Sequence, residues 1–181
     1  MGFLQKRAVA WCLAAVMALG SVVGLGGMKL HARRREAVEA FRNGKDGFSA
    51  YSDLKNRSET AFNLIKIAEQ ILAEDDQTLL AARKAWKAMD EADKPEQYYE
   101  YNNALQGAVD NLYQAMADSG MDAQQQELAQ RQYANFTGRM SNLKFDDYYN
   151  DMAEEYNKTC SGFPAELIAG LTGNGSLPVF R

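Results

Sequence analysis

Histidine and cysteine are scarce in this chain of 181 residues. It has one histidine, His31, and two cysteines, Cys12 and Cys160. One histidine excludes the HExxH zinc motif and the paired Glu-x-x-His motifs of di-iron bundles. It also leaves a serine or cysteine triad without a base, since His31 lies beside a long apolar run. Two cysteines exclude a disulfide framework and paired Cys-x-x-Cys zinc sites.

Phosphate-binding and calcium-binding motifs are missing as well. The sequence has no GxxxxGK[ST] and no GxGxxG, and its glycine-rich stretch 170–175 lacks both the lysine and a preceding strand. Acidic pairs such as Asp75-Asp76 and Asp146-Asp147 lack EF-hand spacing and are typical of solvated helix faces and caps. We therefore expect a chain that is not an enzyme, with no catalytic residue, metal or cofactor.

Basic residues are few beyond the N-terminal region. Residues 1–35 hold six Lys or Arg and no acid, so the remainder has 14 basic against 24 acidic residues. An acidic domain of this kind is repelled by nucleic acid and by anionic headgroups. We expect no nucleic-acid partner.

The most prominent feature that is present is an apolar run. Residues 8–28 are 21 residues without a charge. As a helix they extend about 31 Å, close to the thickness of a bilayer core. With Leu and Val each favourable by roughly 0.3–0.6 kcal/mol, insertion is favourable by about 3 kcal/mol. The run predicts a transmembrane anchor.

A cleaved signal peptide is the alternative interpretation. Lys6 and Arg7 resemble its basic start, and Ala18-Leu19-Gly20 resembles a cleavage site. However, the run continues eight residues past that site and then meets cations, as a stop-transfer segment does. We favour the anchor and leave cleavage open. Gly20 and Gly24 have the GxxxG spacing of paired membrane helices, a weak indication of a homo-oligomer.

The anchor divides the chain into four segments. They are an N-terminal flank (1–7), the anchor (8–28), a basic juxtamembrane segment and turn (29–47), and a helical region (48–181). The cations expected at the lipid headgroups are Lys29, Arg33, Arg34 and Arg35. The Lys and Arg count slightly favours a single-pass protein of the cell membrane with its bundle in the cytoplasm.

The region 48–181 predicts helices separated by short turns. We expect a break at 44–47, a helix over 48–73, an N-cap at Asp76, a helix start at Pro95 and a capping box at 122–125. Apolar residues recur three or four apart, as in the seam Tyr98, Tyr101, Leu105, Ala108, Leu112 and Ala115. The fold class is all-α: an N-terminal transmembrane helix followed by an elongated antiparallel four-helix-type bundle. Arg57 falls on a buried face, and we expect it to pair with an acid.

The sequence resembles the LemA family of bacterial membrane-anchored helical proteins. The resemblance rests on Leu54-Lys55-x-Arg57 and Asn63-Leu64, and on a C-terminal run comprising Tyr149-Asn150, Tyr156-Asn157, Phe163-Pro164 and Ile168-Ala169. Phe62 stands where the family commonly has proline. The resemblance implies an anchored helical bundle but no catalytic activity, cofactor or agreed function.

The C-terminal end has an interpretation of its own. Ser161-Gly162 ends the last long helix, Phe163 then plugs the bundle end, and Pro164 starts a short helix. That helix acts as a lid on the bundle or as a partner-docking face formed by Phe163, Leu167, Ile168 and Leu171. We expect a membrane-anchored protein-interaction or scaffolding module of the bacterial envelope, bound to the bilayer and to an unknown protein. The alternative is a small-ligand or lipid-surface sensing bundle.

Overall fold

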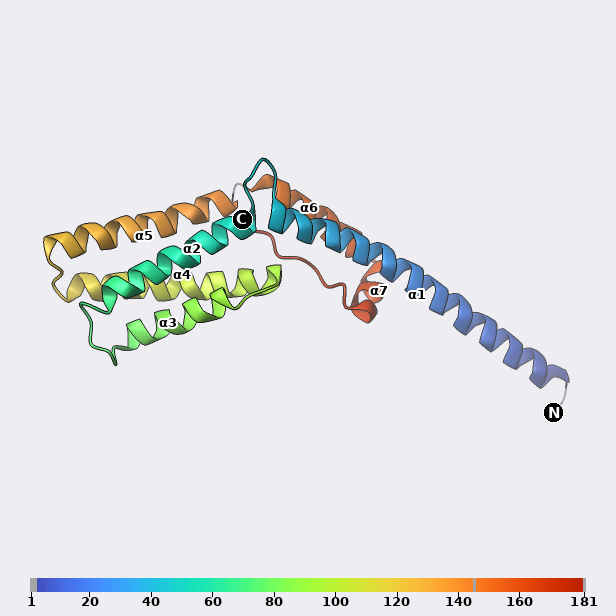
Figure 1. Ribbon diagram of the computed structural model, residues 1–181. Coiled ribbons are helices and arrows are strands. Elements are labelled where there is room, and N and C mark those ends of the chain that lie inside the picture. Colours follow the sequence, from blue (N-terminus) through green and yellow to red (C-terminus); the bar gives the residue numbers. More distant parts are fainter. Residues whose placement is uncertain (1–2, 145, 181) are drawn as a thin grey trace. The chain divides into compact units, whose positions relative to one another are not determined.

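The computed structural model describes residues 3–144 and 146–180, and it is all-α (Figure 1). The first two residues of the expected flank 1–7 lie outside this range. The helices are α1 (Phe3–Asn43), α2 (Ala50–Ala68), α3 (Gln77–Asp90), α4 (Pro95–Asp118), α5 (Ala123–Lys144), α6 (Asp147–Cys160) and α7 (Ala165–Thr172). No β-strand occurs in the described residues, as expected, and a single bridge joins Lys45 to Phe48.

The chain forms two compact units. The first contains the N-terminal part of α1 to Ala37, together with Met152–Leu177. The second contains Val38–Asp151 and the last residues of the chain from Pro178. Most of α6, with α7, thus belongs with α1, so the expected region 48–181 is shared between the two units.

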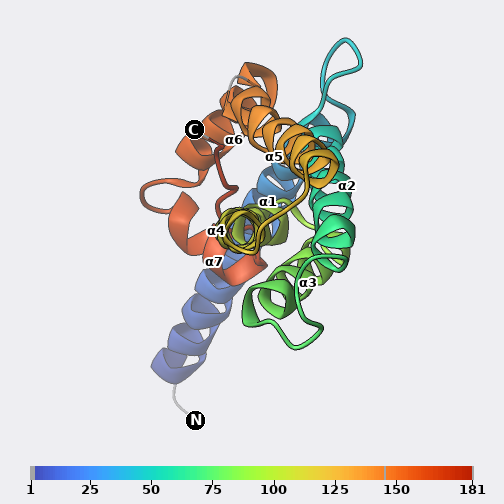
Figure 2. The ribbon, with the colours of Figure 1, turned by 90° about the vertical axis from the view of Figure 1, so that its left-hand side faces the viewer.

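The second unit is built on the four-helix bundle of α2, α3, α4 and α5 (Figure 2). Helix α2 packs against α5 and α3, and α3 packs against α4. Apolar side chains three and four residues apart form the core because that spacing keeps them on one helix face. From α2 these are Leu54, Ala61, Leu64, Ile65 and Ala68.

The α4 seam differs from the expectation at every second position. Tyr98, Leu105 and Leu112 are buried as expected. The positions between them are filled by Asn102, Val109 and Met116 rather than by Tyr101, Ala108 and Ala115. The predicted seven-residue repeat is therefore confirmed, but one of the two buried positions in each repeat lies one residue later than predicted. Val109 and Met116 bury more apolar surface than alanine, and Asn102 enters to bond Arg57.

Capping residues set the helix starts as predicted. Asp76 Oδ1 accepts hydrogen bonds from the backbone N–H of Thr78 (2.8 Å) and Leu79 (3.1 Å), and Pro95 opens α4. Asp122 and Gln125 exchange side-chain-to-backbone bonds of 3.1 and 2.8 Å before α5. Helix α2, however, ends at Ala68 rather than Ala73. The N–H groups of Gln70 and Ile71 bond carbonyls three residues back, which tightens and closes the helix.

A turn at 44–48 separates α1 from α2, as predicted. Gly44 has φ +58°, and a Cβ there would lie 1.6 Å from the carbonyl oxygen of Phe48. The N–H and C=O groups of Lys45 and Phe48 bond each other at 3.0 Å. Only glycine fits this position, because both its backbone conformation and its surroundings exclude a side chain. Before this turn, α1 continues from the apolar run to Asn43 without a break.

The first unit packs one face of α1 against α6 and α7. Gly27, Leu30 and Ala37 on α1 are buried. A Cβ at Gly26 would lie 3.0 Å from Ile168 Cδ1, and one at Gly27 would lie 2.6 Å from Thr172 Cγ2. Small residues on α1 thus allow α7 to approach its backbone.

Candidate functional site

The exposed apolar surface of α1 is the largest feature that the fold leaves unexplained. Among the described residues, α1 is the one helix long and apolar enough to cross a membrane, and none of its most apolar stretch is buried. Exposed large side chains along it are Val9, Trp11, Leu13, Val16, Met17, Val22, Leu25 and Met28. A core helix would bury such residues, and a contiguous apolar surface of this length is typical of a membrane contact.

The basic cluster follows on the same helix. Lys29, Arg33 and Arg35 are exposed, whereas Arg34 is partly buried on the packed side of α1. Arg33 forms an ion pair with Glu36 at 3.2 Å. The helix therefore brings three cations to the surface immediately after the apolar segment.

The predicted docking face of α7 is split by the structure. Phe163, Leu167 and Leu171 are 89, 56 and 66% exposed, whereas Ile168 is 6% exposed. Ile168 points the other way because it packs on Gly26. Phe163 does not plug the bundle end as expected, because its ring is almost fully exposed. The buried side of α7 packs on α1 within the first unit.

The two Tyr-Asn pairs bind the C-terminal segment. In the first unit, Tyr156 Oη donates to the carbonyl of Asn174 (2.8 Å), and the Asn157 side chain bonds both the N–H and the C=O of Leu177 (2.8 Å each). An asparagine amide can satisfy one donor and one acceptor of an extended backbone in this way. The pair thereby fixes the segment on α6.

The second unit repeats this arrangement one heptad earlier. Tyr149 Oη donates to the carbonyl of Pro178 (2.8 Å), and Asn150 bonds the N–H (2.8 Å) and C=O (2.9 Å) of Phe180. The Phe180 ring packs on Tyr149 and near Phe41. Sequence reasoning treated the pairs only as a family signature. Their seven-residue repeat on one helix face was the available signal for a binding role.

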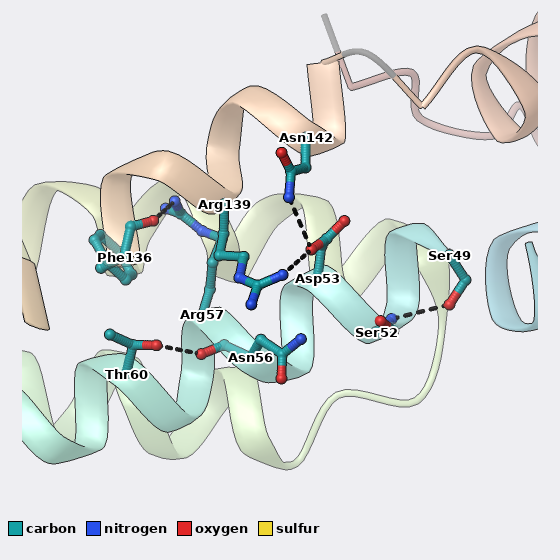
Figure 3. Close-up of polar contacts among 9 residues, drawn as sticks. All are labelled: Ser49, Ser52, Asp53, Asn56, Arg57, Thr60, Phe136, Arg139 and Asn142. Atoms are coloured by element: carbon teal, nitrogen blue, oxygen red, sulfur yellow. Dashed lines mark hydrogen bonds and ion pairs between the residues drawn. The ribbon is translucent and has the colours of Figure 1, made fainter. Parts of the chain in front are cut away.

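Arg57 is fully buried between α2, α4 and α5, and its partner is not the expected acid. Its guanidinium donates to Asn102 Oδ1 (2.8 Å), Gln106 Oε1 (2.7 Å) and the carbonyl of Phe136 (2.6 Å), the last drawn in Figure 3. Gln106 in turn donates to Asp110 (2.8 Å). Burial lowers the pKa of Arg57 to about 10, and the charge of Asp110 opposes that shift. Neutral oxygens thus solvate a cation that stays protonated at pH 7.

A groove of about 640 Å³ lies at the end of the bundle in the second unit. Its charged lining residues are Lys45, Asp53, Asp146, Asp147 and Asp151, and Phe48 and Tyr148 add exposed rings. Two bonds hold the Asp53 carboxylate, from Arg139 (3.1 Å) and Asn142 (3.4 Å), as Figure 3 shows.

Asp146, in the lining of the groove, also interacts with the backbone at the start of α6. It accepts a hydrogen bond from the N–H of Tyr149 (3.2 Å) at the start of α6. Burial raises the pKa of Asp146, and that bond opposes the rise. The groove has an acidic surface with aromatic edges, suited to a cationic segment.

Within the described residues, no three His, Cys, Asp or Glu side chains gather as a metal site.

These features define an all-α protein with a four-helix bundle, a long exposed apolar helix and a C-terminal segment held by Tyr-Asn pairs. The model of the LemA family matches residues 50–181, most of the chain, so the chain belongs to the LemA family. The match begins at the first residue of α2 and includes both Tyr-Asn pairs and α7. No curated protein and no solved structure matches the chain.

Proposed function

We propose that this LemA-family chain is a single-pass membrane protein that holds a helical protein-interaction module at the cell membrane. The observation that carries the proposal is the apolar stretch of α1, which is long enough to span a bilayer and has no buried residue in its most apolar part. Water is a poor solvent for that surface, and the hydrocarbon core of a bilayer would bury it.

The cations that follow this stretch support the same proposal. Lys29, Arg33 and Arg35 are exposed directly after the apolar segment, where they reach phosphate headgroups. On this proposal the module lies in the cytoplasm, because the cations beyond the anchor slightly outnumber those before it.

The acidic groove is the surface that we assign to the protein partner. Its lining has four aspartates, of which Asp53 is paired with Arg139, against one lysine, together with exposed aromatic rings. A segment rich in Lys or Arg complements this charge, and its binding weakens as salt screens the groove. The module acts by binding and holding a partner rather than by catalysis.

The test places a photo-crosslinking residue at Tyr148, which is exposed in the groove, and at Tyr99, which is exposed outside it. We expect a specific, Lys- or Arg-rich crosslinked peptide in intact cells from position 148 and none from position 99. Crosslinks of equal yield at both positions, or none at 148, would remove the assignment.

A charge variant sharpens this test. Asp147→Asn with Asp151→Asn removes two groove carboxylates and keeps Asp146, which bonds the start of α6. We expect loss of the crosslink. Glu74→Gln with Asp75→Asn is the matched control, because it removes two exposed carboxylates from the turn after α2. A crosslink lost equally in both variants would indicate a general charge effect and contradict the assignment of the groove as the partner-binding surface.

A further inference from the structure

We propose that the outer face of α7, formed by Leu167 and Leu171 together with Phe163 just before the helix, inserts into the bilayer boundary beside α1. This inference rests on the proposed membrane anchor and extends it: the protein contacts lipid through two helices rather than one. The occupant of this face is the acyl-chain and headgroup boundary of the same membrane.

The apolar face is exposed and does not contribute to the core of the first unit. The three side chains are spaced four residues apart and are all more than half exposed. With Glu166 and Gly170 they line a shallow hollow of about 430 Å³. The opposite side of α7 is fully used, because Ile168 and Ala169 are buried. Helix α7 is therefore apolar on both sides, although among the described residues of this unit only one side of it is buried.

The contacts with α1 set the depth of α7. Ile168 packs on Gly26, Thr172 packs on Gly27, and Asn174 donates to the Gly27 carbonyl (3.3 Å). Figure 1 draws α7 alongside α1. Residues 26 and 27 are the last glycines of the apolar run, within about 3 Å of its end at 1.5 Å per residue. A helix held there lies at the boundary between acyl chains and headgroups.

The residues of α1 on either side of this boundary have the character expected of a membrane: apolar toward the core and basic toward the headgroups. Leu25 and Met28 of α1 are exposed and continue the apolar surface toward the membrane core. Lys29 and Arg33 lie just beyond, at the headgroups. Helices with one apolar face lie in this plane with that face in the acyl boundary. Glu166 is the single charge of α7 and lies at its N-terminal end, where a side chain of this length reaches water.

The test uses the full chain in phosphatidylcholine–phosphatidylglycerol vesicles. On a Cys12→Ala, Cys160→Ala background, single cysteines at Leu167, Val16 and Leu80 carry an environment-sensitive fluorophore. Leu80 is the aqueous control because it is an exposed leucine on the bundle surface. Quenching is measured with nitroxide-labelled lipid and, separately, with aqueous iodide.

We expect position 167 to behave like position 16: strong quenching by the lipid nitroxide and protection from iodide. Position 80 should show the reverse. Iodide access at 167 with lipid quenching at 16 would overturn the α7 proposal and keep the anchor. Absence of lipid quenching at 16 would overturn the anchor itself. Protection of 167 from both quenchers would indicate a protein neighbour, such as a second copy, and would also overturn the proposal.

A second variant guards against an effect of the label. Phe163→Cys carries the fluorophore with and without Leu167→Gln and Leu171→Gln. The glutamines replace exposed residues and leave Ile168 in place, so the α1 contact is preserved. We expect lipid quenching at position 163 to fall several-fold in the glutamine variant. Unchanged quenching would contradict insertion of this face.

Discussion

At the scale of single residues, Arg57 organises the contact between α2, α4 and α5. Its burial follows from helix phase and is readable from the sequence. Its partners are not, because Asn102, Gln106 and the Phe136 carbonyl meet it only through the register of three helices. We expected an acid because buried cations are commonly paired. Three neutral acceptors meet the same need, and the guanidinium carbon lies 3.9 Å from the centroid of the Phe136 ring.

Arg57→Met should destabilise the bundle by about 2–4 kcal/mol, because it leaves buried acceptors without donors. Urea unfolding of the full chain in detergent, followed by circular dichroism, measures the change. Arg131→Met on the exposed surface of α5 is the matched control and should stay within about 0.5 kcal/mol of the wild type. Equal unfolding midpoints for the two variants would contradict the role given to Arg57.

Asp76 gives a pH-dependent prediction. Hydrogen bonds from Thr78 and the α3 backbone lower its pKa below the usual 3.8. The charged form therefore stabilises the fold above pH 3.8, and the contribution is lost as pH falls through the lowered pKa. Asp76→Asn keeps a cap oxygen without the charge. We expect the wild type to exceed this variant in melting temperature at pH 7, and the difference to vanish near pH 2.

For this comparison, Asp75→Asn removes a carboxylate from the same turn and serves as the control. A wild-type advantage over Asp76→Asn that stays constant from pH 7 to pH 2 would show that charge at the cap does not matter.

At the scale of elements, the sequence predicts where most helices start but few of the contacts between helices. The starts at Asp76, Pro95 and Asp122 follow local rules that involve four residues or fewer. The end of α2, the shifted row of α4 and the place of α7 depend on neighbours far along the chain. The apolar pattern of α7 predicted either a lid on the bundle or a partner-docking helix, and only the packing of Ile168 on Gly26 shows which side of α7 is buried.

Two glycines allow the effect of steric fit to be compared with the effect of helix propensity. Gly44→Ala should destabilise the turn after α1 by more than about 1 kcal/mol, because φ is positive and the Cβ would meet the Phe48 carbonyl. Gly138→Ala, in an exposed part of α5 with open space around it, should stabilise by about 0.5–1 kcal/mol. Thermal unfolding of both variants measures the signs. A stabilising Gly44→Ala would contradict the turn geometry.

The Tyr-Asn pairs of α6 give a prediction with residue resolution. Asn157→Ala removes both bonds to Leu177, and Asn150→Ala removes both bonds to Phe180. Each should speed hydrogen exchange of the amide that it held, by roughly tenfold or more for a loss of about 1.4 kcal/mol. Asn103→Ala, exposed on α4, is the control. Unchanged exchange at the C-terminal segment would show that the pairs do not hold it.

At the scale of the whole molecule, a long apolar helix precedes a region, residues 36–181, that has 24 acidic and 14 basic residues. Membership of the LemA family and the helical fold could both be predicted from the sequence, because anchor, caps and seams are local or periodic patterns. The acidic groove could not be predicted, since it combines residues from the turn before α2, the end of α5 and the start of α6. The Tyr-Asn repeat of α6 is a signal for a binding role, but it does not indicate that the bound segment is the C-terminal one.

The most direct test of the account is the effect of charge inside α1 on membrane retention. Arginine near the centre of a spanning helix costs about 2.5–3.5 kcal/mol, so Leu13→Arg with Val16→Arg exceeds the roughly 3 kcal/mol that favours insertion of residues 8–28. After alkaline extraction of membranes, the wild type and the control Leu80→Arg should stay in the pellet, and the double variant should be released. Release of the wild type, or retention of the double variant at the wild-type level, would contradict the anchor.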